Sequence, residues 1–276
     1  MNGVGPTAAH QALALLDSWD VPHAAGAVVP RDREPLVHGG VSRLFRVASV
    51  GKLLAGYAIM VGVEEGAVAL DDPAGPPGST LRHLLAHASG YGFDDDAGVI
   101  AAPGTRRIYS NRGIEAAAAH LERAADMPFR QYLAEAVLHP LGMGDTDLPA
   151  SPAHSLRSTV VDLARFLREL HEPTVLAAET VAEMRTVQFP GLRGMLPNVG
   201  RFDPLDWGLT FEHSFGRPGH WAGTSPSRDT VGHFGGAGTF LWDDPVAGVG
   251  VVVLTDRAFG PWALEVWPAF ADAVLV

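Results

Sequence analysis

The sequence predicts an α+β fold, an α/β sandwich in which one sheet is assembled from both ends of the chain and a helical lobe lies between them. Short apolar segments bounded by turn residues are typical of strands, and they occur before residue 40 and again after residue 205. From about residue 80 to residue 200, apolar residues recur at helical spacing instead. Early strands, a helical middle and late strands together indicate one sheet formed by segments that are distant in sequence.

The first elements are expected to be a helix, a hairpin and a second helix. Pro6 to Trp19 has an amphipathic helical pattern, and the apolar stretch Ala24 to Val29 predicts a strand. A turn at Pro30-Arg31-Asp32 then predicts a hairpin to Leu36-Val37. From Ser49 to about Glu65 the apolar residues follow a helical period, which Gly66 ends.

The rest of the chain is expected to continue with helices and to close with strands and a helix. The predicted helices of the middle are Thr80–His87, Asn111–Ala125, Pro128–Leu138, Ser158–Leu170 and Glu179–Val187. The predicted strands are Trp207–Phe211, Val231–Trp242 and Gly248–Thr255, with a turn at Asp243-Asp244-Pro245 and a closing helix from Pro261 to Val274. We expect a single catalytic domain over residues 1–276, with a sheet lobe at about 1–48 and 200–276 and a helical lobe at about 49–199. A cleft would lie at the seam between the lobes.

Composition excludes several classes of function. The chain of 276 residues has a formal charge of −11 and is 47% hydrophobic, which is typical of a globular protein and argues against a nucleic-acid partner. The first residues have no signal-peptide pattern, and no apolar run is long enough to span a membrane, so we expect a cytoplasmic protein with no membrane partner. The absence of cysteine excludes disulfides, thiolate metal sites and cysteine nucleophiles.

The single lysine of the chain is the first candidate for a catalytic group. Lys52 stands against nineteen arginines, and Ser49 precedes it by three residues. Unlike arginine, a desolvated lysine can lose its proton near neutral pH. At helical spacing, residues three apart share a face, so the serine hydroxyl and the amine can meet. The alternative is a surface lysine near an unrelated serine.

Two further segments could converge on the predicted cleft. Tyr109-Ser110-Asn111 leads directly into a predicted helix, and a tyrosine before an Asn helix cap is its ordinary interpretation. The segment His233 to Gly238 carries three glycines within a predicted strand. Glycine weakens strand interiors, so these positions indicate either a close approach of the backbone to another group or a β-bulge.

In this order, the Ser-x-x-Lys, the Tyr-x-Asn and the late basic-x-Gly strand resemble the serine β-lactamases and penicillin-binding proteins. The resemblance is closest to the branch of class C β-lactamases and esterases, and matching segments extend from residue 46 to residue 257. They include Leu81–Gly90, which is similar to that branch's "RHLLxHxSG", and also Pro103–Asn111, Pro140–Met143, Gly232–Leu241 and Leu254–Asp256. The resemblance implies a β-lactamase/transpeptidase-like fold, with an antiparallel sheet built from both chain ends and a helical lobe.

The resemblance also implies roles for individual residues. Ser49 would be the nucleophile that forms an acyl-enzyme, and Lys52 and Tyr109 would complete the catalytic set. Which of these two is the general base is left open. The backbone N–H groups of Ser49 and Gly236 would form the oxyanion hole, and the side chain of Asn111 would hold Lys52 or a substrate carbonyl.

One departure from the family pattern bears on the substrate. Where penicillin-recognising enzymes have Lys-Thr-Gly, this chain has His233-Phe234-Gly235, which lacks the hydroxyl and weakens the positive charge expected beside a substrate carboxylate. We therefore expect a serine esterase, or an acyltransferase, acting on a small ester or amide. The alternatives are a β-lactamase or D-amino-acid peptidase on the same site, and a non-catalytic binding relative.

A metallohydrolase is a third class that the histidines suggest. His83 and His87 are four apart on a predicted helix, but Leu84 stands where zincin chemistry needs a glutamate. Helix packing is the preferred interpretation, and no metal or cofactor is expected. The sequence leaves the oligomeric state open.

Overall fold

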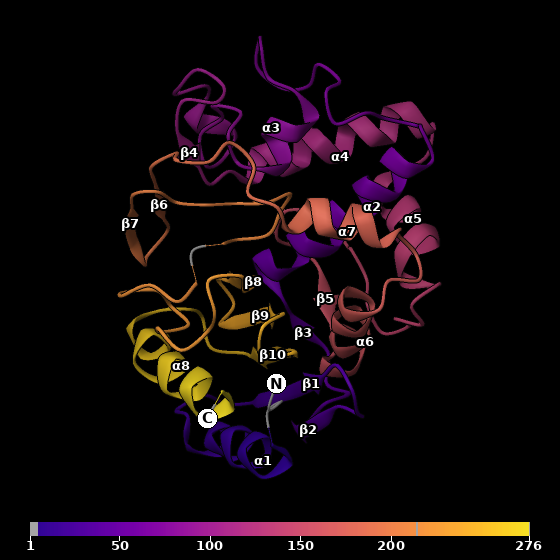
Figure 1. The fold of residues 1–276 in the computed structure, drawn as a ribbon. Coiled ribbons are helices and arrows are strands. Elements are labelled where there is room, and N and C mark those ends of the chain that lie inside the picture. The colour runs from indigo at the N-terminus through magenta and orange to yellow at the C-terminus, as the bar shows by residue number, and fades with distance from the viewer. Residues whose placement is uncertain (1–4, 214, 276) are drawn as a thin grey trace.

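The computed structural model describes residues 5–213 and 215–275. Its centre is a five-stranded antiparallel sheet with the strand order β2-β1-β10-β9-β8 (Figure 1). The strands are β1 (Ala24–Pro30), β2 (Leu36–Gly39), β8 (Val231–Gly235), β9 (Thr239–Asp244) and β10 (Val249–Thr255). Strands β1 and β10 pair over seven positions, so the two ends of the chain meet in the middle of the sheet. The expected α+β fold, with one sheet built from both ends, is confirmed.

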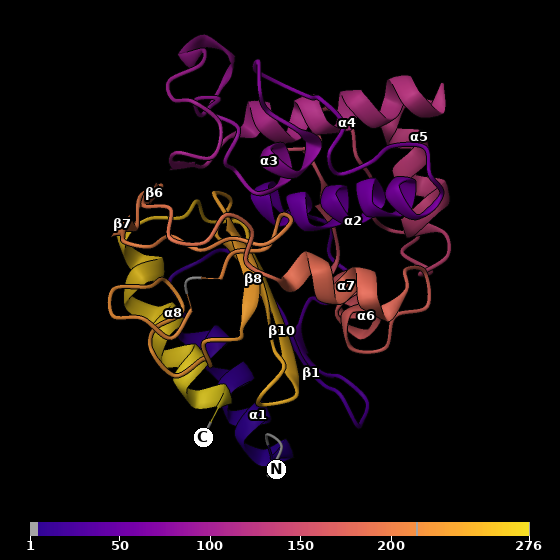
Figure 2. The same ribbon diagram turned by 45° about the horizontal axis from the view of Figure 1, so that its top comes forward.

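Helices cover both faces of this sheet. On one face lie α1 (Pro6–Ala14), which continues as a 3₁₀ turn over Leu15–Ser18, and α8 (Pro261–Val274); on the other lies α6 (Val160–His171) (Figure 2). Strand residues alternate between the two faces. Val28 and Val251 belong to the apolar cluster under α1 and α8, whereas Ala27 and Val252 belong to the cluster on the α6 side.

The remaining helices pack around α2 (Gly51–Glu64), which follows a 3₁₀ turn over Ala48–Val50. Every residue of α2 from Gly51 to Gly62 is buried, because its apolar side chains surround the helix rather than forming one stripe. The helices around it are α3 (Leu81–Leu85), α4 (Asn111–Ala125), α5 (Phe129–Leu133) with a π-helical turn over Ala134–Leu138, and α7 (Ala178–Arg185). A short 3₁₀ turn spans Asp95–Ala97.

Two predicted strands differ from the structure. The segment Val231–Trp242, expected to be one strand, is a hairpin: β8 ends at Gly235, and Gly238 in the turn has a φ of +82°, a conformation that glycine adopts without strain. The segment Trp207–Phe211 is buried but forms only an isolated bridge between Trp207 and Glu212. Its apolar residues fill the core without joining a ladder. The expected turn at Asp243-Asp244-Pro245 begins later, because β9 extends through Asp244.

Five short strands were not predicted. One pair is β3 (Phe45–Arg46) with β5 (Arg157–Ser158). A second small sheet contains β4 (Arg107–Ile108), β6 (Gly194–Leu196) and β7 (Gly200–Phe202), in which β4 and β6 are parallel. Segments of two or three residues carry no periodic signal, so sequence patterns do not reveal them.

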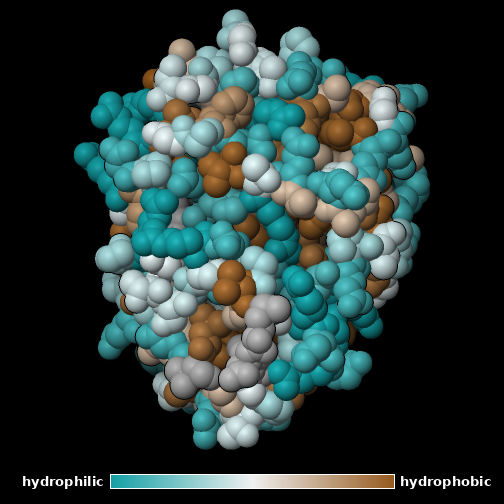
Figure 3. Space-filling model, in the orientation of Figure 1, coloured by the Kyte–Doolittle hydropathy of each residue, from teal (hydrophilic) through white to brown (hydrophobic). Residues whose placement is uncertain are grey.

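The surface in the orientation of Figure 1 is largely hydrophilic, with apolar residues in separate patches (Figure 3). Among the described residues, no helix combines the length and the apolar character that crossing a membrane requires.

Candidate active site

Ser49 lies in the 3₁₀ turn that leads into α2. The residue before it, Ala48, has a φ of +47°, a left-handed conformation that is unfavourable for a residue with a Cβ. Such strain is common where a fold fixes the direction of a functional side chain. The Ser49 side chain is half-buried, so its hydroxyl is held by the fold and still accessible.

Lys52 lies one helical turn after Ser49 and is fully buried. Its Nζ contacts three oxygens: Oγ of Ser49 at 3.0 Å, Oδ1 of Asn111 at 2.7 Å and the carbonyl of Ala153 at 2.6 Å. Burial lowers the pKa of Lys52 to about 7, although the carboxylates of Glu115 and Asp94 oppose this shift. The lysine can therefore exchange a proton near neutral pH.

Asn111 is the first residue of α4 and is itself buried. Its Nδ2 donates to Oδ1 of Asp94 at 2.9 Å. This contact orients the amide, because only the amide nitrogen can donate to a carboxylate, and it turns Oδ1 toward Lys52. The helix cap is Ser110, whose Oγ accepts the N–H of Gly113 at 3.0 Å. The capping role that the sequence offered for the asparagine thus belongs to the serine before it.

Tyr109 lies at the end of β4, with its ring buried beside Lys52. The Nζ of Lys52 is 4.8 Å from the ring centroid, and the Tyr109 hydroxyl shares a hydrogen bond with Ser49. Burial raises the pKa of Tyr109, and the hydrogen bond to Ser49 only partly offsets this. The phenol therefore stays protonated at neutral pH. The site thus brings together Ser49, Lys52, Tyr109 and Asn111.

The two side chains at the start of the predicted basic-x-Gly segment point to opposite faces of the sheet. His233 is 1% exposed and packs against Tyr109, with ring centroids 5.4 Å apart. Burial lowers the pKa of His233 to about 3, so this imidazole carries no charge at neutral pH. Phe234 is 7% exposed and packs against Phe259 and Trp221 under α8. Only a small edge of this ring is open for contact with a substrate.

Strand β8 is the edge of the sheet next to Ser49, and its register decides which backbone groups face outward. Gly232 pairs with Glu212 on the open edge. Gly236 directly follows β8 and begins the turn to β9, and its carbonyl accepts the N–H of Phe259 at 3.0 Å. Gly235 packs closely: a Cβ there would lie 2.4 Å from the carbonyl oxygen of Val47.

Several groups at this site have no counterpart among the predicted site residues. The carbonyl of Ala153 carries no sequence signal, because any residue could supply it. Asp94 lies in a run of three aspartates, Asp94–Asp96, that matches no catalytic motif. His87 is buried, with its Nδ1 accepting the Ser110 N–H at 3.2 Å. Its ring lies 4.8 Å from Tyr109 and 5.0 Å from Trp207, so these residues fix the tyrosine in place.

Within the described part of the chain, no three His, Cys, Asp or Glu side chains are grouped so that they could hold a metal ion. His83 stacks on Phe189 and interacts with Thr80 at the start of α3. These contacts are structural, and the ring centroids of His83 and Phe189 are 4.2 Å apart.

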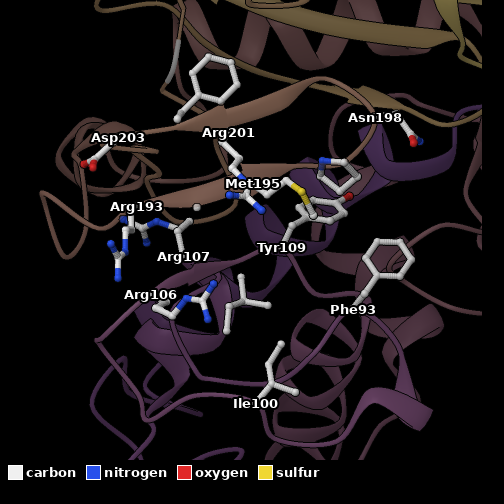
Figure 4. A pocket seen from close by; sticks show the side chains of 14 residues that line it. Phe93, Ile100, Arg106, Arg107, Tyr109, Arg193, Met195, Asn198, Arg201 and Asp203 are labelled. Carbon is white, nitrogen blue, oxygen red and sulfur yellow. The ribbon is translucent and has the colours of Figure 1, made fainter.

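Two cavities adjoin the site. One of about 860 Å³ has Tyr109 in its wall (Figure 4). The other, of about 580 Å³, is lined by Ala48 and Gly236, among others. A substrate whose carbonyl carbon lies at Ser49 would therefore have room on two sides.

Comparison with known proteins places this geometry in a family. Residues 21–275 match the family model described as Beta-lactamase. A beta-lactamase from Mycobacterium bovis is 49% identical, with a TM-score of 0.93, and the match covers 96% of this chain and 98% of that structure. The hydrolase EstCE1, described as having promiscuous acyltransferase activity, shares the fold with a TM-score of 0.78 at 18% identity, over 98% of this chain and 99% of that one.

A curated relative matches over a shorter segment. The D-alanyl-D-alanine-carboxypeptidase/endopeptidase AmpH of Escherichia coli is 28% identical over an alignment of 153 residues, and the match covers 42% of this chain and 40% of that protein. The aligned region thus spans less than half of that relative's length. With nearly its whole length matched by the family model, and with a serine, a buried lysine and a tyrosine in mutual contact, the chain belongs to the beta-lactamase family of serine hydrolases.

Proposed function

We propose that the protein is a serine esterase or acyltransferase that forms an acyl-enzyme at Ser49. The observation that carries this proposal is the set of contacts around Lys52. A neutral lysine has two N–H donors and one lone pair. The carbonyl of Ala153 and Oδ1 of Asn111 can only accept, so they take both donors. The lone pair then faces the remaining neighbour, the hydroxyl of Ser49.

This arrangement favours Lys52 over Tyr109 as the general base. A base must be largely deprotonated near the working pH. Lys52, with a pKa of about 7, meets that condition, whereas the raised pKa of Tyr109 keeps its hydroxyl protonated. Tyr109 is then suited to the opposite role, because its hydroxyl can donate a proton to the leaving oxygen.

The proposed reaction has two steps. Lys52 takes the proton of Ser49 as Oγ attacks the ester carbonyl, and the N–H groups of Ser49 and Gly236 stabilise the oxyanion. The leaving oxygen takes a proton from Tyr109, and the alcohol departs. Lys52 then gives its proton to Tyr109. A water molecule, or an acceptor alcohol in a transferase, then attacks the acyl-enzyme. Lys52 accepts the proton of the water or alcohol and passes it to Oγ of Ser49, so the serine and the neutral lysine are regenerated as the carboxylic acid or new ester leaves.

The segment at β8 supports esters over penicillins as substrates. His233 is buried and neutral, and Phe234 supplies no hydroxyl, so neither replaces the cation and the hydroxyl of Lys-Thr-Gly. A substrate carboxylate at this position would lose those partners and pay for its desolvation. A neutral ester loses nothing there.

The proposal is tested with the purified protein and a series of short-chain p-nitrophenyl esters. We expect turnover, and we expect Ser49→Ala to lower kcat/KM by about 10³-fold or more, because no other nucleophile replaces the hydroxyl. A fluorophosphonate probe should add its mass to Ser49 in the wild-type protein and not in the variant. Wild-type activity in Ser49→Ala would refute the proposal. Absence of both turnover and labelling would favour the non-catalytic binding relative.

A second candidate is a β-lactamase or D-amino-acid peptidase on the same residues. The Mycobacterium bovis relative, 49% identical, bears the name beta-lactamase, and this similarity favours the candidate. The chemistry at Ser49 would be the same, with an amide in place of the ester. Turnover of nitrocefin, or of a D-Ala-D-Ala peptide, with a kcat/KM above that of the best ester would establish it.

A further inference from the structure

The cavity next to Tyr109 has a positively charged side. Arg106, Arg193 and Arg201 line it, and all three side chains are exposed. In the described part of the chain, none of these guanidinium groups has a side-chain hydrogen bond or an ion pair. By contrast, the exposed Arg157 pairs with Asp147 at 2.5 Å. The chain has a net charge of −11, so a cavity lined by three arginines and one carboxylate, Asp203, has a local excess of positive charge.

The fold itself brings these arginines together. Arg106 directly precedes β4, Arg193 directly precedes β6, and Arg201 lies in β7, so each strand of the small sheet contributes one. The pairing of Arg107 with Gly194 aligns the first two strands. Arg107 itself is buried and donates to backbone carbonyls, including those of Ala86 and Leu205. It anchors the sheet and adds positive charge beneath the cavity.

The cavity also has an apolar side. Phe93, Ile100 and Met195 line it, although they are 44%, 56% and 59% exposed. Large apolar side chains that are exposed together in a concave surface are typical of a binding site. Figure 4 shows Arg106 and Arg193 on one side of the cavity and Phe93 on the other. The complementary ligand has an apolar body and an anionic end.

Tyr109 connects this cavity to the nucleophile, because it lines the cavity and its hydroxyl contacts Ser49. In the proposed mechanism, that hydroxyl gives a proton to the leaving oxygen, so the leaving group extends along Tyr109 into the cavity. We propose that Arg106, Arg193 and Arg201 bind a carboxylate or phosphate on the alcohol portion of the ester. This inference rests on the proposed function and adds the class of leaving group.

The experiment compares butyrate esters of three phenols: a neutral 4-(methoxycarbonyl)phenyl ester, a 4-carboxyphenyl ester and a 4-(phosphonooxy)phenyl ester. The measured quantity is the ratio of kcat/KM for each anionic ester to that for the neutral ester. Intrinsic reactivity cancels when this ratio is compared between protein variants. We expect Arg106→Gln, Arg193→Gln and Arg201→Gln each to lower the ratio by about 3–10-fold, as for a partly exposed charged hydrogen bond. The anionic ester whose ratio falls more in these variants carries the preferred anion, either carboxylate or phosphate.

Two matched variants sharpen the test. Arg123→Gln removes an exposed arginine of α4 that lies outside the cavity wall, and it should leave the ratio unchanged. Asp203→Asn removes the acidic group that also lines the cavity, and it should raise the ratio. High salt should reduce the preference in the wild-type protein, because exposed charges are screened.

Two outcomes overturn the inference. One is a ratio that is the same in the three arginine variants as in the wild-type protein. The other is an effect confined to an anion on the acyl side, measured with phenyl hydrogen glutarate against phenyl valerate. Binding of 4-hydroxybenzoate and 4-hydroxyphenyl phosphate, measured by calorimetry, separates this inference from the proposed function. If no ester is hydrolysed but binding still requires the arginines, only the proposed function fails.

Discussion

The behaviour of Lys52 is determined mainly by its burial. An exposed lysine is protonated at neutral pH, and such a group cannot accept a proton from a serine. The fold places the amine among Ser49, Asn111 and Ala153, out of contact with water. Desolvation outweighs the nearby carboxylates and lowers the pKa to about 7. Burial thus gives Lys52 a pKa at which it can accept a proton near neutral pH.

This pKa predicts the pH dependence of ester hydrolysis. The active form has neutral Lys52, so kcat/KM should rise as the pH increases through about 7 and then level off. Below pH 7 it should fall about tenfold for each pH unit, since one protonation blocks the base. Stopped-flow measurements between pH 5 and pH 9 provide the profile. A flat profile across this range would contradict the role of Lys52.

Lys52→Arg provides the matching variant, because arginine keeps the charge and does not release its proton. We expect kcat/KM to fall by about 10²–10⁴-fold, with the rise near pH 7 lost. Thermal unfolding of the variant serves as the control for folding. Near-full activity in a folded Lys52→Arg protein would exclude proton transfer by this residue.

At the scale of elements, the β8–β9 hairpin is fixed against the segment that precedes Ser49. Thr239 Oγ1 donates to the carbonyl of Val47 at 2.9 Å. Gly235 leaves no room for a side chain, since a Cβ would also lie 2.5 Å from Thr239 Oγ1. These contacts hold the edge strand β8 at a fixed distance from the nucleophile.

Gly235→Ala is therefore predicted to separate the hairpin from the nucleophile segment. A shift of about 1 Å can reduce turnover by about 10²-fold, and overpacking typically costs about 1–3 kcal/mol of stability. Ester kinetics and thermal unfolding measure both effects. Gly236→Ala is the matched control for stability, because a Cβ at that position meets no atom within 4 Å. Equal unfolding midpoints for the two variants would show that Gly235 is not tightly packed.

Sequence patterns predicted long elements well and short ones poorly. The buried helix after Ser49 and the central strands β1 and β10 are long apolar segments that the sequence shows directly, whereas the small sheet of β4, β6 and β7 depends on pairing between distant segments. The glycines after Phe234 were interpreted within a strand because their φ angles are not visible in sequence. At the site, side chains with a motif were identified, but the carbonyl of Ala153 was not, since a backbone acceptor has no residue signature.

At the scale of the whole molecule, buried charges connect the helical part to the sheet. Asp243 of β9 is completely buried and contacts His171 of α6 at 2.5 Å and Arg185 of α7 at 2.6 Å. Burial alone would raise the pKa of Asp243, but the hydrogen bond from His171 and the charge of Arg185 hold it below its ordinary value. Two consecutive helices, α6 and α7, are thus tied at one point to a strand that is distant from them in sequence. This supports the proposal that residues 1–276 form a single domain.

We predict that this domain unfolds in one cooperative transition. Asp243→Asn should therefore lower the stability of the sheet and of the helical part together. Removing one partner of a buried ion pair typically costs about 3–5 kcal/mol, because the remaining charge is left without compensation. Chemical unfolding followed by tryptophan fluorescence and by loss of ester hydrolysis should give coincident curves in both proteins. Asp147→Asn, which breaks the exposed pair with Arg157, should change the midpoint little. If hydrolysis were lost in a separate, earlier transition, or if the two variants were equally stable, the helical part and the sheet would be independent units.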